Sequence, residues 1–207
     1  GKLYFQETTG NWQTSQITKA EGVLGLFVED TPLDLTFNIR VNLEELRNTA
    51  LSPTDQPFPP PLPLLAMLDR LEGQADLRLR LEGQAEGDYP ETFSGELKLL
   101  GASLYRAPFP LPFTNLQGIL SFSPDQVETT SLTGKVGSSP FTLEGKVADL
   151  QRPNPMMDLQ MTAPLEARDL QAFLPSGFPP LATSAGPLAL KLSLQGTTQQ
   201  LQFNHEL

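Results

Sequence analysis

Apolar and polar residues alternate one by one in several short stretches of the chain. The clearest run is Leu77-Arg-Leu79-Arg-Leu81, and residues 188–194 repeat this order with a leucine at every second position. Successive side chains of a β-strand point to opposite faces, so the alternation predicts strands with one buried and one wet face. Such strands usually occur in antiparallel sheets. Further strands are predicted at 35–41, 96–99, 120–122, 135–136, 141–143, 159–161 and 201–203.

Turn-forming residues separate these stretches. Glycine, proline, serine, asparagine and aspartate gather between them, and each favours a turn for its own conformational reason. Loops are predicted at 123–125, 137–140 and 153–155.

Three short helices and one extended connector complete the predicted elements. Asn42 is expected to cap a helix over 43–50 that carries Glu44 and Glu45 in its first turn. Helical spacing of apolar residues predicts two more helices, at 64–72 and at 166–174. The proline-rich segment 53–63 is expected to be an extended connector, because proline cannot donate to a central ladder.

Two parts of the sequence match each other. Residues 73–83 and 186–196 both run from one glycine to another through three alternating leucines, and their offset is 113 residues. The preceding strand and helix signals match at an offset of 124 residues, as from Asp34 to Asp158, and the longer proline-rich connector of the first copy accounts for the difference. We therefore expect one continuous repetitive domain over 1–207, with approximate copies at 22–115 and 116–207.

Composition narrows the classes of partner. The 20 prolines and 16 glycines among 207 residues suit many short strands joined by turns. A formal net charge of −10 without a cluster of basic residues opposes binding to nucleic acid and to an anionic membrane surface. The chain has no cysteine and no apolar run near the roughly 20 residues that span a bilayer. No signal peptide opens it, so any anchor or export segment is expected outside this sequence.

Residues suited to catalysis or metal binding are sparse. The single histidine, His205, lies close to the end of the chain, where a catalytic triad is not expected to form. The acidic pairs Glu29-Asp30 and Glu44-Glu45 are adjacent in sequence, so their side chains do not converge on a strand or a helix. Carboxylates that meet only in the folded chain stay open as a route to sugar hydrolysis. The sequence predicts no enzyme, no cofactor and no metal site.

The rhythm of glycines and strands resembles a known family. Gly118-Ile-Leu-Ser-Phe122, then residues 132–137 and 141–150, and finally residues 169–175 and 186–197 resemble repeats of AsmA-like proteins. The resemblance covers about 22–197 and is clearest from Phe113 onward. It implies an inner-membrane-anchored periplasmic protein of a Gram-negative bacterium, related to TamB, YhdP and bridge-like lipid transfer proteins. Such a protein folds a long curved antiparallel sheet with a few short helices into an apolar-lined, β-taco-like groove.

The leucine stripes allow two interpretations. They either fill the closed core of a β-sandwich or line an open groove for lipid chains. The predicted lining consists of Leu35, Phe37, Ile39, Leu77, Leu79, Leu81, Leu97, Leu99, Leu120, Phe122, Phe141, Leu143, Leu159, Met161, Leu190, Leu192 and Leu194.

The resemblance implies that the groove holds acyl chains of phospholipids, or of another acyl-chain lipid, during transport between inner and outer membrane and outer-membrane biogenesis. The alternative function is a non-enzymatic structural or interaction module of the cell envelope. The terminal strand around Leu201 is expected to expose an edge, and such an edge favours self-association with another chain.

Overall fold

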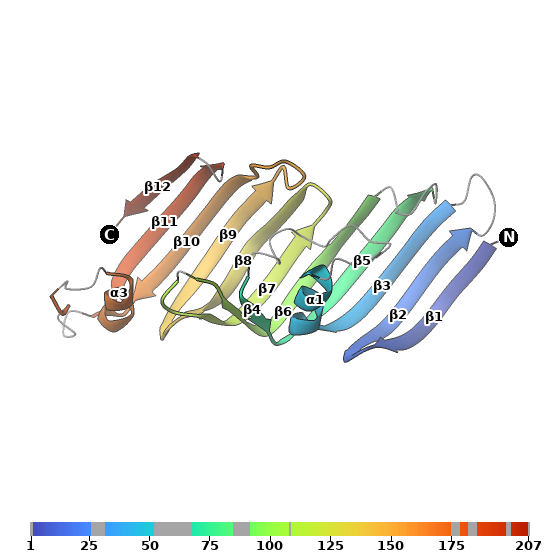
Figure 1. The fold of residues 1–207 in the computed structure, drawn as a ribbon, viewed down its shortest axis with the longest axis horizontal. Helices are drawn as coiled ribbons and strands as arrows, with labels where there is room; N and C mark the ends of the chain where they lie inside the picture. Colours follow the sequence, from blue (N-terminus) through green and yellow to red (C-terminus); the bar gives the residue numbers. More distant parts are fainter. Residues whose placement is uncertain are drawn as a thin grey trace.

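The computed structural model shows a single long antiparallel sheet with two short helices (Figure 1). The structure describes residues 2–25, 32–51, 68–84, 92–107, 109–174, 179–181, 186–197 and 200–206. The predicted connector at 53–63 and the acidic pair Glu29-Asp30 lie outside these residues.

The strands follow one another in the sheet in the order of the sequence. The path runs β1-β2-β3-β5-β6-β7-β8-β9-β10-β11-β12, and β4 pairs with β6 beside this path. Within the described residues, β1 and β12 each pair on one side only. The sheet is therefore open, and the alternative of a closed β-sandwich is wrong. The strands are β1 Lys2–Trp12, β2 Ser15–Gly25, β3 Pro32–Asn42, β4 Arg70–Glu72, β5 Gln74–Gln84, β6 Thr92–Tyr105, β7 Phe113–Phe122, β8 Gln126–Val136, β9 Ser139–Ala148, β10 Met156–Leu165, β11 Leu188–Thr197 and β12 Gln200–Glu206.

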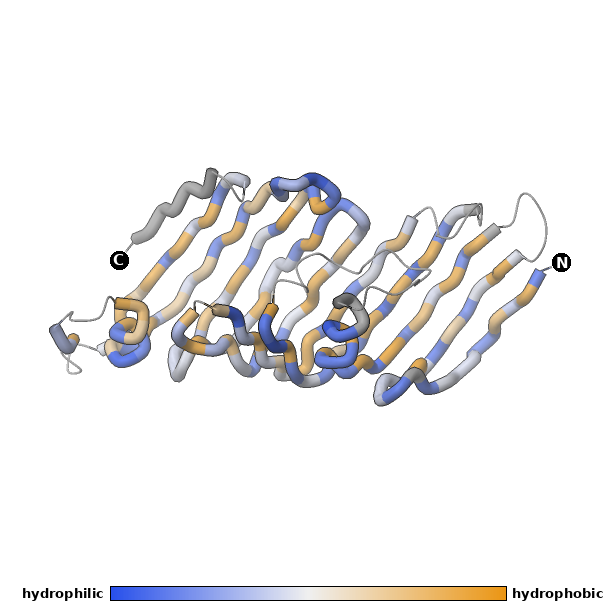
Figure 2. Tube along the Cα trace, in the orientation of Figure 1, coloured by the Kyte–Doolittle hydropathy of each residue, from blue (hydrophilic) through white to orange (hydrophobic). Residues whose placement is uncertain are grey.

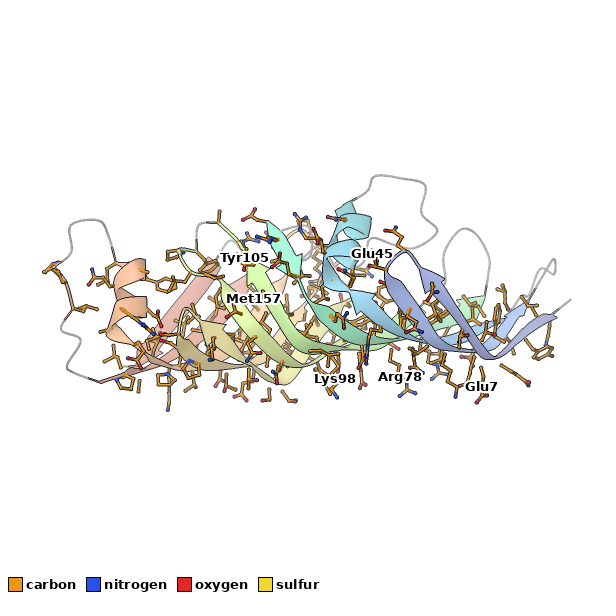
Figure 3. All side chains as sticks on the ribbon, turned by 90° about the horizontal axis from the view of Figure 1, so that it is seen from below. Glu7, Glu45, Arg78, Lys98, Tyr105 and Met157 are labelled. Carbon is orange, nitrogen blue, oxygen red and sulfur yellow. The ribbon has the colours of Figure 1, made fainter. Side chains whose placement is uncertain are left out.

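The helices lie on one face of the sheet, near one of its long edges. They are α1 Leu43–Leu51, which follows β3, and α3 Ala167–Phe173, which follows β10. Viewed along the sheet, α1 and α3 stand on the same side of a curved layer, and Glu7, Arg78 and Lys98 point away on the other side (Figure 3). Hydropathy alternates along the strands as a two-faced sheet requires (Figure 2).

Most predicted elements are confirmed, but one helix is wrong and one loop is shorter than predicted. The loop predicted at 137–140 ends at Ser138, because Ser139 and Pro140 already pair with β8 as the start of β9. Every predicted strand lies within an observed strand, and Asn42 caps α1 through its Oδ1, which accepts hydrogen bonds from the N–H groups of Glu44 at 3.0 Å and Glu45 at 3.4 Å. The helix predicted at 64–72 is contradicted at its end, where Arg70–Glu72 forms β4. Leu71 is 5% exposed and pairs with Leu104 near the end of β6, so sheet pairing and burial outweigh the helical spacing there.

The hydrophobic core lies under the helices. Leu43 of α1 is fully buried, and Val41, Ala75 and Leu99 form a neighbouring row across β3, β5 and β6. Leu46 of α1 and Leu170 of α3 pack against the same cluster. The helices thus cover the apolar face along one long edge of the sheet (Figure 1).

Bulges and close backbone approaches curve the sheet. The register shifts between Ile17 and Lys19 in β2 and between Thr129 and Leu132 in β8, and such shifts increase local twist. Gly22 and Gly145 lie on the apolar face in positive-φ conformations of 133° and 127°. A Cβ atom on either would collide with a carbonyl of the next strand.

Candidate functional site

The apolar face continues from strand to strand because like residues lie opposite one another. Leu35 pairs with Leu81 and Phe37 with Leu79, across β3 and β5. Residues that lie directly opposite in an antiparallel pair project to the same face. A longer row crosses four strands through Ile39, Leu77, Leu97 and Leu120.

The predicted lining residues all lie on strands, and the core cluster divides them into two groups. The first group belongs to this cluster or packs against it: Ile39, Leu77, Leu97, Leu99, Leu120, Phe122, Phe141, Leu143, Met161 and Leu190. The second group lies outside the cluster, and we call it the outer band: Leu35, Phe37, Leu79, Leu81, Leu159, Leu192 and Leu194. The outer band is therefore the part of the predicted lining that the helix-covered core does not use.

The outer band has two equivalent blocks. In the first, Leu35 and Phe37 of β3 face Leu81 and Leu79 of β5. In the second, Leu159 of β10 faces Leu194 of β11, and Leu192 of β11 faces Met161, which packs against the core cluster. The offsets of 124 and 113 residues seen in the sequence thus bring corresponding residues into the same cross-strand pairs. The boundaries of the copies, at 22–115 and 116–207, stay predictions.

The two blocks differ in accessibility. Leu35 and Leu81 are buried, at 7% and 4% exposure. Leu159, Leu192 and Leu194 are only half-buried. The second block therefore offers more of its apolar surface to a ligand.

The sequence-based list missed several residues that share this face. Phe93 lies opposite Leu81, and a row through Val127, Val147 and Met157 crosses β8, β9 and β10. The isolated valines gave too short an alternation to stand out, and Phe93 is the second residue of its strand, between threonine and serine.

A buried carboxylate attaches each helix to the hairpin turn beside it. Beside α1, Glu45 accepts hydrogen bonds from the hydroxyls of Ser15 at 2.7 Å and Thr14 at 2.9 Å. The Ser15 hydroxyl also accepts a hydrogen bond from the N–H of Asn42 at 3.2 Å. One serine therefore connects the turn, the end of β3 and the helix.

The second copy repeats this arrangement 124 residues later. Asp169 of α3 accepts hydrogen bonds from the hydroxyls of Ser139 at 2.6 Å and Ser138 at 2.7 Å. Ser139 in turn accepts a hydrogen bond from the N–H of Glu166 at 2.8 Å. We call Ser15–Glu45 and Ser139–Asp169 the two carboxylate latches. The sequence signal for the latches was a serine and an acid that both recur at an offset of 124 residues, but only the fold brings the serine and the acid into contact.

The latches keep both acids ionised to lower pH than usual. Burial acts to raise the pKa of Glu45 and of Asp169, because it disfavours the charged form. Hydrogen bonds from Ser15 and Thr14, and from Ser139 and Ser138, outweigh burial, so both pKa values lie below their usual range. The hydrogen bonds therefore hold each helix against its hairpin turn through a charged carboxylate.

The opposite face of the sheet is polar and carries charges of both signs. Arg40 pairs with Asp76 at 2.8 Å, and Arg80 pairs with Glu82 at 2.7 Å. A shallow hollow of about 400 Å³ lies here, between Asn38 and Lys98. A second hollow, of about 450 Å³, lies among threonines and prolines of β8, β9 and β10. Neither hollow lies at the outer band.

Metal-binding groups and membrane-spanning helices are absent from the described residues. In the ranges given above, no group of three or more histidine, cysteine, aspartate or glutamate side chains is placed to hold a metal ion. His205 lies on β12, where its backbone pairs with Leu192. Among the described helices, none is long and apolar enough to cross a membrane.

Comparison with known proteins yields no match among family models, curated proteins or solved structures. The fold and the two-faced pattern are therefore the basis for any functional proposal.

Proposed function

We propose that the outer band binds acyl chains of lipids, and that the chain is a periplasmic section of a longer lipid-transport protein. The observation that carries this proposal is the open, two-faced sheet, whose apolar face extends beyond the core beneath α1 and α3. An apolar sheet face outside the core is a natural site for an apolar ligand.

The physical driving force is burial of methylene groups. Each methylene transferred from water contributes roughly 0.8 kcal/mol. A tail of about a dozen methylenes would thus bind through contact with leucine, phenylalanine and methionine side chains, without a specific hydrogen bond. The half-buried Leu192 and Leu194 are the preferred contacts.

The charge distribution predicts weak selection of head groups. The chain has a formal net charge of −10, which repels a phosphate-bearing head group at long range. Binding through the tail alone leaves many similar positions along the sheet. Such weak and similar positions favour movement of a lipid along the face over its retention.

The resemblance to AsmA-like repeats supports the wider setting of the proposal. In that setting the parent protein is anchored in the inner membrane of a Gram-negative bacterium, and the sheet conducts phospholipid toward the outer membrane. The described repeat of strand, helix and strand is compatible with a section of such an array.

The proposal is tested by native mass spectrometry with lipid extraction after purification from bacterial cells. Leu79→Asp and Leu192→Asp place a charge in each block of the outer band and are expected to abolish co-purified lipid. Ser193→Asp is the matched control, because Ser193 neighbours Leu192 on the same strand and faces the polar side.

A fluorescent fatty acid gives a second readout. Wild type and Ser193→Asp are expected to take up the probe, and Leu192→Asp is expected to lose most of the uptake while keeping its circular dichroism spectrum. A folded wild type with neither co-purified lipid nor probe uptake would refute the proposal.

One observation favours a second candidate, a structural or interaction module of the cell envelope. β1 and β12 each lack a partner on one side among the described strands. Free strand edges pair readily with other strands. Sedimentation that depends on protein concentration, without lipid uptake, would favour this candidate.

A further inference from the structure

The two blocks of the outer band are joined by further residues of the apolar face. The register of the sheet places one residue of each strand on the path from β5 to β10 in a single row that crosses the strands, and we call it the cross-sheet row. Residues directly opposite each other in antiparallel pairs share a face, so the whole row lies on the apolar face. Its members, all apolar or glycine, are Leu79, Gly95, Phe122, Val127, Val147 and Met157.

The cross-sheet row begins in one block and ends beside the other. Leu79 belongs to the first block. Met157 lies two residues before Leu159 on β10, and residues two apart on a strand share a face, so the row meets the second block there. Neighbouring strands lie about 4.8 Å apart, so the five steps from β5 to β10 extend over about 24 Å.

The missing side chain of Gly95 does not break the row. A Cβ atom on Gly95 would lie 2.5 Å from the Cζ atom of Phe122, so the Phe122 ring occupies this space. Phe93 lies two residues before Gly95 on β6, and its ring centroid is 6.4 Å from that of Phe122. Aromatic surface therefore continues from the first block across β6 to β7.

The middle of the row is narrow and lies outside the core cluster. Val127 is half-buried, Val147 is 8% exposed, and neither belongs to the cluster. On the inner side of the row, Thr129 lies opposite Gly145, which has no side chain and is only half-buried. On the outer side, β8 begins at Gln126, one residue before Val127. The apolar surface outside the core is therefore a narrow strip at this point.

We infer that the two blocks and the cross-sheet row form one site, in which a single long, unbranched acyl chain lies across the strands. A narrow apolar strip fits an extended chain without branches, and each methylene that leaves water adds to binding. A chain that reaches from one block over Val127 toward the other gains contacts that a short chain on one block lacks. The inference rests on the proposed function and adds the ligand class and the number of chains bound.

The test compares octanoate with palmitate by displacement of a fluorescent fatty acid, and native mass spectrometry counts the bound palmitate. Wild type is expected to bind one palmitate per chain, at least about tenfold more tightly than octanoate, because more methylenes leave water. Val127→Asp places a charge in the middle of the row. It is expected to weaken palmitate binding at least about tenfold and to leave octanoate binding within about twofold, because a short chain contacts one block only.

Two further variants complete the test. Gln126→Asp is the matched control, because Gln126 neighbours Val127 on the same strand and faces the polar side. It is expected to bind both fatty acids as wild type does. Val127→Thr keeps the shape of the side chain and adds a hydroxyl, so it tests the row even if Val127→Asp does not fold. It is expected to weaken palmitate binding several-fold with an unchanged circular dichroism spectrum.

Failure of the inference differs from failure of the proposed function. A folded wild type that binds neither fatty acid refutes both. Two palmitates per chain, or a palmitate affinity that neither Val127 substitution changes, would overturn the single site and leave two separate lipid-binding blocks. An equal loss of palmitate binding in Gln126→Asp would also overturn it, since added negative charge on either face would then explain the result.

Discussion

The two copies of the repeat share their buried contacts and differ on their polar surface. At each helix a serine hydroxyl joins the helix carboxylate to a backbone N–H where the preceding strand meets the helix. On the polar face, Arg40 and Asp76 form an ion pair between β3 and β5, whereas the equivalent pair of β10 and β11 is Pro164 and Ala189.

This difference separates what the fold requires from what it tolerates. The carboxylate latches and the cross-strand leucine pairs recur because they place a helix over the sheet and cover apolar surface. The ion pair does not recur, although the sheet continues with the same register. The free energy of unfolding should therefore depend strongly on the shared features and weakly on the others.

The largest effect is expected at the glycines that approach the next strand. Gly145→Ala would force a Cβ against the carbonyl of Asp158, and Gly22→Ala would do the same against Asp34. Overpacking and the positive φ together predict a loss of about 3 kcal/mol in the free energy of unfolding for each. Urea denaturation followed by circular dichroism measures it.

Gly10→Ala is the matched control, since nothing lies within 4 Å of a Cβ at Gly10. It is expected to change stability by less than about 0.5 kcal/mol. A loss as large as that of Gly145→Ala would show that strand flexibility, and not the close approach, decides the result.

The sequence predicted the shared features unevenly. The alternation of apolar and polar residues located the strands, because burial on one face imposes a period of two. The repeat offsets of 113 and 124 residues indicated which leucine pairs correspond. The latches could not be predicted, since Ser139 and Asp169 are distant in sequence and a serine beside a turn commonly bonds to the turn's own backbone. The helix predicted at 64–72 failed because pairing of Leu71 with Leu104 depends on a strand far along the chain.

The outer band was predicted only as part of a larger set. Period-two alternation marks every residue on the apolar face, so it cannot separate Leu192 from Leu97. Whether a residue belongs to the core or to the outer band depends on where α1 and α3 end and on which strand residues their side chains contact. Packing between distant segments therefore decides which residues are available to a ligand.

An intermediate effect is expected when both latches lose their charge. Glu45→Gln with Asp169→Asn is expected to lower the free energy of unfolding by about 2 kcal/mol at neutral pH, because buried hydroxyl and N–H donors lose a charged acceptor. Glu44→Gln is the control, since Glu44 is an exposed neighbour on the same helix.

The effect of pH follows from the lowered pKa values. A carboxylate with a lower pKa in the folded state stabilises it fully above the unfolded pKa, near 4.5 for Glu45 and 3.8 for Asp169. The contribution is lost as pH falls through the folded pKa. Urea titrations from pH 7 downward should show wild type and variant converging below about pH 4. A difference in the free energy of unfolding between wild type and variant that stays constant at all pH values would contradict the assigned role of the charge.

The smallest effect is expected from the ion pair that only the first copy has. Asp76→Ala copies Ala189, and it removes a pair whose side chains are 52% and 44% exposed. Exposed pairs contribute roughly 0–1 kcal/mol, so the variant should unfold within about 0.5 kcal/mol of wild type, and salt should narrow the gap further. Thermal unfolding at low and high salt measures both. A loss that approached the glycine effect would mean that the polar face helps to hold the first copy together, and the second copy would then need a substitute that Pro164 and Ala189 do not provide.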